Sequence, residues 1–256
     1  RVKVEDVEIR LVDPETGQTV LSGMGELHLD ILKDRIRREY KIEANTGKPM
    51  VAYYETITQS AGGEHTFDRE VGGKHQFARV CLEVVPRERG TGCSIEFDVS
   101  ADRIPHDMRP AIEEGLQDGI VTGVIGRYPM TDLQVRVVDG RFDEEASTDV
   151  AFRTAAVMGF REVIMKAGPE LLEPIMMLEI LTPPESMGDV LGDLNGRRGR
   201  VFEMTVQGGF QLIRAGVPLA ELFGYSTVIR SLSRGRANYT MEPKQFDVVP
   251  LSVRER

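Results

Sequence analysis

The order of strand and helix signals over residues 173–242 constrains the fold of this chain more than any other feature. After a first strand, the sequence Thr-Pro-Pro-Glu at 182–185 supplies a helix N-cap, proline in the first turn and glutamate at the capping-box position. The elements predicted in order are a strand at 175–181, a helix to about Gly196, paired strands at 200–206 and 211–217, a helix at 219–233 and a strand at 237–242. This βαββαβ order is that of the ferredoxin-like fold, so such a domain is predicted at 173–256.

Residues 1–57 repeat part of the same order. Strands are predicted at 7–13, 19–23, 41–43 and 51–57. A helix is predicted at 26–40, because its apolar residues recur along one face. That apolar stripe consists of Leu29, Leu32, Ile36 and Tyr40. A ferredoxin-like sheet without its leading strand and helix would leave an edge uncovered, so we expect a partial domain whose start lies upstream of Arg1.

Residues 58–172 mix strands with two helices. Strands are predicted at 79–85 and 133–138, and helices from Pro105 or Pro110 to Gly119 and from the possible caps Ser147 or Thr148 to about Ala167. The second helix is apolar around much of its circumference and should pack closely on a sheet. Its large apolar residues are Phe152, Val157, Phe160, Val163 and Ile164, and its small ones are Ala151, Ala155, Ala156 and Gly159. The predicted fold class is therefore α+β, with domains at 1–57, 58–172 and 173–256.

Composition narrows the class of protein. Of 256 residues, 41% are hydrophobic and 29% charged, and no apolar run approaches the roughly 20 residues of a membrane helix. Cys81 and Cys93 are too few for a disulfide framework, so a soluble protein of the reducing cytoplasm is expected. The net charge is −9, and residues 58–172 carry 13 Lys and Arg against 20 Asp and Glu. Such a chain does not find nucleic acid through overall positive potential.

Motifs for nucleotide hydrolysis and metal binding are missing from the sequence. The two Gly-Lys pairs, at 47–48 and 73–74, lack both the preceding glycine and the following Ser or Thr of a phosphate-binding loop. The four histidines do not have metal-ligand spacing, and no carboxylate pair suggests acid-base catalysis. We therefore expect no catalytic residue, no metal and no cofactor in these residues.

Two segments have residue types that suit RNA contact. The stretch Gly-Gly-Lys-His-Gln-Phe at 72–77 combines flexible backbone, a cation and an aromatic ring, although a plain hairpin turn has the same composition. Arg197, Arg198 and Arg200 could bind phosphate oxygens, or could stabilise the end of the preceding helix through its dipole. The residues by themselves leave both alternatives open.

Three groups of residues closely resemble the elongation factor G family, in family order across nearly the whole chain. The first is PETGQTVLSGMGELHL at 14–29, with NTGKP at 45–49 and VAY at 51–53. The second is LEPIM at 172–176, MGDV at 187–190 and DLNGRRG at 193–199; the third is VPLAELFGYST at 217–227, with Arg230 and Gly235. The resemblance implies part of a third domain, a fourth domain like domain 2 of ribosomal protein S5, and a ferredoxin-like fifth domain.

The resemblance also implies a role. Members of the family are ribosome-dependent GTPases, and their GTP and magnesium bind an upstream domain, so this stretch alone is expected to be inactive. The fourth domain enters the decoding region of the small subunit as tRNA and mRNA advance, and the fifth contacts the large subunit. Two tip loops are carried over to this sequence. They are Gly72, Gly73, Lys74, His75, Gln76 and Phe77, and, within 139–144, Arg141, Phe142 and Asp143.

One tip residue departs from the family pattern. Asp143 follows the aromatic Phe142 at the position where the family usually has a histidine. A carboxylate is repelled by phosphate, whereas an imidazole can donate a hydrogen bond and stack on a base. A monomeric translocation factor that contacts both ribosomal subunits, tRNA and mRNA is our leading hypothesis. A recycling or ribosome-protection paralogue and a standalone RNA-binding module remain alternatives.

Overall fold

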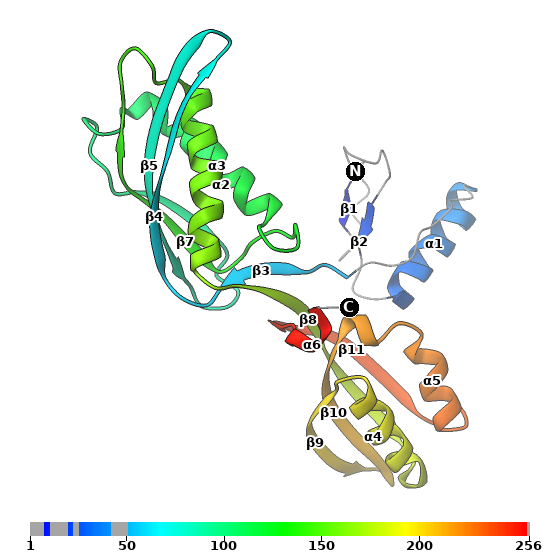
Figure 1. Cartoon of the computed structure of the whole chain (residues 1–256). Coiled ribbons are helices and arrows are strands. Elements are labelled where there is room, and N and C mark those ends of the chain that lie inside the picture. The colour runs from blue at the N-terminus through cyan, green and yellow to red at the C-terminus, as the bar shows by residue number, and fades with distance from the viewer. Residues whose placement is uncertain (1–7, 11–19, 23–25, 42–50, 255–256) are drawn as a thin grey trace. The chain divides into compact units, whose positions relative to one another are not determined.

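The structure, a computed structural model, describes residues 8–10, 20–22, 26–41 and 51–254 (Figure 1). The chain divides into two compact units, one of Arg1–Ala52 with Pro174–Asp247 and one of Tyr53–Glu173 with Val248–Arg256. We call the second one the middle unit and describe each unit by itself. Helices and sheets occur in both, which confirms the predicted α+β class.

The C-terminal part of the chain, from β8 on, forms a ferredoxin-like sheet. Its strands are β8 (Pro169–Thr182), β9 (Arg200–Gln207), β10 (Phe210–Pro218) and β11 (Asn238–Val248), and its helices are α4 (Met187–Gly196) and α5 (Tyr225–Leu232). The strand order is β11-β8-β10-β9, with β10 antiparallel to both of its neighbours. The predicted βαββαβ order is thus confirmed. Alternate residues of the central strands, such as Leu178, Ile180 and Ile213, are fully buried in its core.

Two local predictions in this domain are wrong. Thr182 does not cap a helix, because it remains paired with Gln211 as the last residue of β8, and its hydroxyl is buried without a hydrogen bond. A 3-10 turn over Pro184–Ser186 leads into α4 instead. The helix predicted at 219–233 is also interrupted. Gly224 has a φ of 72°, a left-handed conformation that ends the short turn Leu219–Glu221 and allows α5 to start anew.

The middle unit has a four-stranded sheet with two helices on one face (Figure 1). The strands are β4 (Ala61–Val71), β5 (Lys74–Pro86), β7 (Leu133–Arg141) and β6 (Ser94–Phe97), in that order across the sheet. The helices are α2 (Arg109–Thr122), preceded by a 3-10 turn at His106–Met108, and α3 (Asp149–Lys166). Alternate residues of β5 face these helices and are buried, namely Ala78, Val80, Leu82 and Val84.

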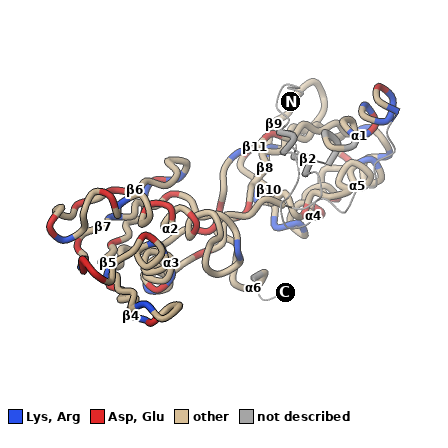
Figure 2. The backbone as a smooth tube through the Cα atoms, turned by 90° about the horizontal axis from the view of Figure 1, so that it is seen from above, with Lys and Arg blue, Asp and Glu red and all other residues tan. Residues whose placement is uncertain are grey.

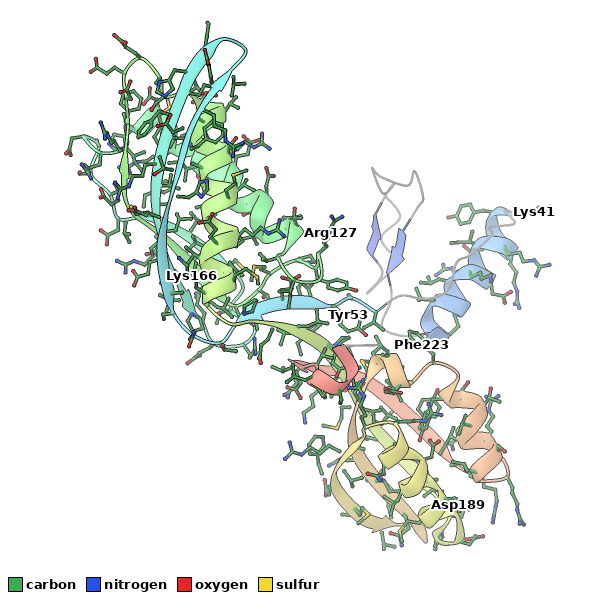
Figure 3. All side chains as sticks on the ribbon, viewed as in Figure 1. Lys41, Tyr53, Arg127, Lys166, Asp189 and Phe223 are labelled. Atoms are coloured by element: carbon green, nitrogen blue, oxygen red, sulfur yellow. The ribbon has the colours of Figure 1, made fainter. Side chains whose placement is uncertain are left out.

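A buried carboxylate holds the loop that follows α2. Glu55 lies in β3 (Tyr54–Ile57), which pairs with Pro169–Leu172 at the start of β8. Its side chain is fully buried and accepts hydrogen bonds from four backbone amides, those of Val124, Ile125, Gly126 and Tyr128, at 2.7–3.2 Å. These bonds provide the charge stabilisation that a buried carboxylate requires. The loop, where Arg127 is labelled in Figure 3, is therefore shaped by a residue far away in sequence.

The N-terminal residues are described only in part. Strands β1 (Glu8–Arg10) and β2 (Val20–Ser22) pair antiparallel, and α1 covers Glu26–Tyr40 as predicted. Leu32 is buried, and Leu29 and Ile36 are half-buried, but Tyr40 is 58% exposed, so the apolar stripe ends one turn earlier than predicted. The strand predicted at 41–43 lies almost wholly outside the described residues. None of the helices in the described ranges is long and apolar enough to cross a membrane.

Helices α2 and α3 approach each other closely at glycine. A Cβ atom on Gly115 would lie 2.6 Å from the carbonyl oxygen of Arg153 and 3.1 Å from the Cβ of Ala156. The small residues predicted to allow close packing therefore do so against another helix as well as the sheet. Val157, predicted as part of the apolar surface of α3, is 36% exposed, because it points away from both.

Replacing Gly115 with alanine should destabilise the middle unit. The added methyl group meets backbone that cannot move alone, and such overpacking costs about 1–3 kcal/mol. Gly192→Ala is the matched control, because Gly192 lies in α4 with open space around its Cβ position and should tolerate alanine. Chemical denaturation would measure the stability of both variants, and hydrogen exchange of the α2 amides would locate the effect of Gly115→Ala. Equal protection of α2 in Gly115→Ala and wild type would contradict the packing described.

Candidate functional site at the end of the middle unit

Two separate segments meet at one end of the middle unit. The turn between β4 and β5 and the segment from β7 to α3 both lie at the end where α3 begins (Figure 1). Lys166, the last residue of α3, lies at the opposite end of that helix (Figure 3). We call residues 72–77 and 141–148 together the tip.

The first tip segment is mostly strand. Val71 pairs with Lys74, and only Gly72 and Gly73 form the turn, with φ angles of 62° and 76°. Positive φ at both positions is the requirement of the type I′ hairpin turn, which explains the two glycines. The hairpin alternative is therefore correct for the backbone. Lys74 and the following His75 project from the tight turn as exposed side chains.

Side-chain contacts orient the aromatic residues of this segment. The His75 Nε2 atom lies 2.7 Å from Asp68 Oδ1 on the facing strand. The guanidinium carbon of Arg141 lies 5.4 Å from the centroid of the half-buried Phe77 ring, within the range of a cation–π interaction. Arg141 is thus held beside the hairpin although it belongs to the second segment.

The second tip segment is a turn built around Asp143. Its Oδ1 atom accepts hydrogen bonds from the amides of Glu145 and Ala146, at 3.1 and 3.0 Å. Its own carbonyl accepts the amide of Ser147 at 2.9 Å. Phe142 packs against the apolar core just before this turn. The carboxylate that we expected to face phosphate is therefore engaged in holding its own backbone.

Hydrogen bonds join the two segments. The Phe77 amide donates to the Ala146 carbonyl at 2.9 Å, and the Ser147 hydroxyl donates to the Phe77 carbonyl at 2.7 Å. The Thr148 hydroxyl lies 3.4 Å from Gln76 Oε1 and accepts the Ala151 amide as the N-cap of α3. Of the two possible caps, Thr148 is thus the one used. The two segments of the tip are one connected structure, and these hydrogen bonds run through residues 146–148, just after the second loop predicted at 139–144.

The sheet face turned away from the helices is covered by paired charges. Arg79 pairs with Glu64, Arg136 with Glu83 and Asp98, and Arg103 with Asp139. Both basic and acidic residues occur in this unit (Figure 2). Among the described residues no group of three or more His, Cys, Asp or Glu could hold a metal ion. On the described part of this sheet face, the arginines named above thus have carboxylate partners, whereas Lys74 at the tip is exposed.

Comparisons with known proteins account for nearly every residue. Family models match in order, described as Elongation Factor G, domain III at 1–48, Elongation factor G, domain IV at 49–168 and Elongation factor G C-terminus at 170–256. The chain belongs to the elongation factor G family. A crystal structure from Thermus thermophilus is similar to it, with 35% identity and a TM-score of 0.74. That similarity covers 97% of this chain and 37% of the other, so this chain spans about a third of its relative.

The family models assign the tip to one domain. It lies in the part that matches domain IV of elongation factor G, and this part is also the acidic region of the sequence. The match to the C-terminal model contains the ferredoxin-like sheet. The domain boundaries at 57/58 and 172/173 stay a prediction beside the model boundaries near 48 and 169.

The arginines of the C-terminal domain differ in their surroundings. Arg197 forms an ion pair with Asp193 at 2.8 Å and lies over the Tyr225 ring at 5.1 Å. Arg198 pairs with Glu221 at 3.0 Å. Burial raises the pKa of the Tyr225 phenol, so that ring remains a neutral partner for Arg197. Both arginines thus stabilise their own domain, whereas Arg200 is exposed at the start of β9.

Sequence reasoning missed two contributors to the tip. Asp68 contacts His75 because the two-residue turn sets the strand register, which the sequence alone did not decide. Ser147 was considered only as a helix cap, since its partners on β5 and at Asp143 become visible only in the folded chain. The signal that could have found Ser147 is that two hydroxyl residues stand side by side before the helix. A helix needs only one N-cap, so the other hydroxyl is available for a different contact.

Removing the Asp143 carboxylate should loosen the second tip segment. In Asp143→Ala, the amides of Glu145 and Ala146 should exchange about fivefold faster, corresponding to about 1 kcal/mol of lost hydrogen bonding. Asp143→Asn retains an oxygen acceptor and should have a smaller effect. Hydrogen exchange measured by NMR would test this, with the exposed neighbour Glu144→Ala as control. Unchanged exchange in Asp143→Ala would show that the carboxylate does not hold the turn.

A second prediction concerns pH. Hydrogen bonds from Arg103 and from the Gly140 backbone lower the pKa of Asp139 from 3.8 to about 2. Its contribution to stability is therefore present above about pH 4 and is lost as the pH falls towards 2. In Arg103→Ala the Asp139 pKa should rise towards 3.8, with a modest loss of stability because the carboxylate is 41% exposed. NMR titration of the carboxyl groups would measure the Asp139 pKa. In the control variant Arg136→Ala, the Asp139 pKa should not change.

Proposed function

We propose that this chain is the part of a ribosomal translocase that drives tRNA and mRNA movement through the tip of its domain IV. The observation that carries this proposal is the hydrogen-bonded union of the two tip segments at one end of the domain that matches domain IV. In this proposal the tip does mechanical rather than covalent work. GTP and magnesium would bind a domain outside these residues, and the factor would act as a monomer in the cytoplasm.

The chemistry of the tip supports RNA contact. The Lys74 ammonium group is exposed beside a turn that brings the backbone close to a partner, and such a cation suits a phosphate oxygen. The exposed His75 imidazole, oriented by Asp68, can stack on an unpaired base or bond its edge. The Arg141 guanidinium is held over Phe77, so its position costs less entropy when RNA arrives.

Delivery of the tip by the whole factor would explain how an acidic domain can contact RNA. The acidic middle region would not bind RNA tightly by itself. If the ribosome-bound body carries the tip, the local concentration of the tip at the decoding region becomes high, and little intrinsic affinity is needed. We propose that both subunits are partners, with domain IV facing tRNA and mRNA on the small subunit and the C-terminal domain facing the large one, where Arg200 is the most accessible of the three arginines.

A recycling or ribosome-protection paralogue is the second candidate. The observation that favours it is Asp143, an acid where the family usually has histidine. Because this carboxylate holds its own turn, it is compatible with a tip that meets a different surface. The full-length factor should be tested for translocation, for ribosome splitting with the recycling factor and for drug release on the same ribosomes. A standalone RNA-binding module would promote none of these.

The double variant Lys74→Ala with His75→Ala should slow translocation roughly tenfold, equivalent to about 1.4 kcal/mol in the barrier. The two exposed side chains would act after docking, so ribosome binding should change little. Arg161→Ala is the matched control, because it removes an exposed cation from α3 outside the tip. Rapid-kinetic measurement of tRNA movement would decide. A double variant that is folded and translocates at the wild-type rate would exclude the tip from function.

A further inference from the structure

The backbone of Phe77 lies in the part of β5 that no longer pairs with β7. Strand β5 pairs with β7 only as far as Arg79 opposite Arg141, after which β7 leaves the sheet. Phe77 lies two residues before Arg79 in β5, nearer the hairpin turn. Its N–H and C=O therefore point to the side that β7 no longer occupies. Unpaired backbone groups at such a half-buried position are unfavourable. The segment after β7 supplies the missing partners.

One of those partners is a side chain. The Ala146 carbonyl accepts the Phe77 amide, but the Phe77 carbonyl is bonded by the Ser147 hydroxyl at 2.7 Å. The same hydroxyl oxygen accepts the amide of Asp143 at 3.0 Å. A hydroxyl can donate one bond and accept another, and here it does both across the two tip segments. Since Thr148 already caps α3, Ser147 is not needed for that purpose.

We propose that Ser147 is a positioning residue that locks the β4–β5 hairpin to the turn at Asp143, so that Lys74, His75 and Arg141 meet RNA at a fixed spacing. This inference rests on the proposed translocation function. In the described part of the chain no strand pairs with the hairpin beyond Phe77 on the β7 side, so the direction of the hairpin depends on the last bonds that anchor β5. Without the hydroxyl, the hairpin and the turn can move independently, and part of the force exerted by the tip is lost as local motion.

The test compares three variants in the full-length factor. Ser147→Ala removes the bridging hydroxyl and should slow translocation three- to tenfold with unchanged ribosome binding. Ser147→Thr keeps the hydroxyl and should restore most of the rate. Thr154→Val is the matched control, because the Thr154 hydroxyl donates to the Val150 carbonyl within α3, outside the tip. Its rate should equal that of wild type.

Two further readouts separate positioning from general stability. Hydrogen exchange of the Asp143 amide, which donates to the Ser147 hydroxyl, should accelerate in Ser147→Ala and not in Thr154→Val. Adding the Lys74→Ala and His75→Ala changes to Ser147→Ala should slow translocation less than they do in wild type, because the hairpin has already lost its fixed position. Strictly additive effects would indicate independent contributions and overturn the proposal.

The outcomes distinguish this inference from the function on which it rests. A wild-type factor that does not promote translocation overturns the proposed function and the role of Ser147 with it. A wild type that translocates together with a Ser147→Ala variant of equal rate overturns the role of Ser147 alone. A Ser147→Thr variant that translocates slowly, although its Asp143 amide exchanges as slowly as in wild type, would also overturn the role of Ser147. The hydroxyl bridge would then be present without effect.

Discussion

The burial of α3 against β5 is the interaction on which the rest of the middle unit depends. Phe152 and Phe160 are completely buried beneath the sheet, and burying side chains of this size contributes about 1.5–3 kcal/mol each. This packing fixes where the helix can begin. Thr148 caps that beginning beside Gln76, and the preceding Ser147 reaches Phe77. The geometry of the tip is thus a consequence of the core, transmitted through the first turn of one helix.

If the tip contacts RNA as we propose, charge pairing explains how an acidic unit can do so. The arginines of the open sheet face, and Arg197 and Arg198 in the C-terminal domain, have carboxylate partners in the same molecule. The exposed pairs on the sheet face contribute little stability, whereas the pairs of Arg197 and Arg198 are partly buried; in both places a carboxylate already occupies the cation. We therefore expect weak non-specific binding to RNA. Lys74 and Arg141 are exposed at the tip, so in this proposal the contact would be short-lived rather than tight.

Two elements show how far local sequence signals reach. The helix α1 was predicted with its observed bounds, because its periodicity and charged opposite face leave few other structures possible. The helix predicted at 219–233 was wrong at Gly224, and the cap predicted at Thr182 was wrong because strand pairing with Gln211 competes for that residue. At Thr182 a local helix signal was overridden by strand pairing, whereas the interruption of the second helix follows from the left-handed conformation of Gly224.

By itself, the sequence determined the order of the elements, the paired glycines of the hairpin turn, the acidic middle region and the motifs of its family. These are properties of neighbouring residues or of composition, and they need no knowledge of which strands meet. Only the tertiary structure decided that Asp143 holds its own turn, that Glu55 binds a loop after α2, and that Ser147 bridges two segments far apart in the chain. A hydrogen bond between distant residues depends on register and burial, and both arise only when the sheet and its helices pack together.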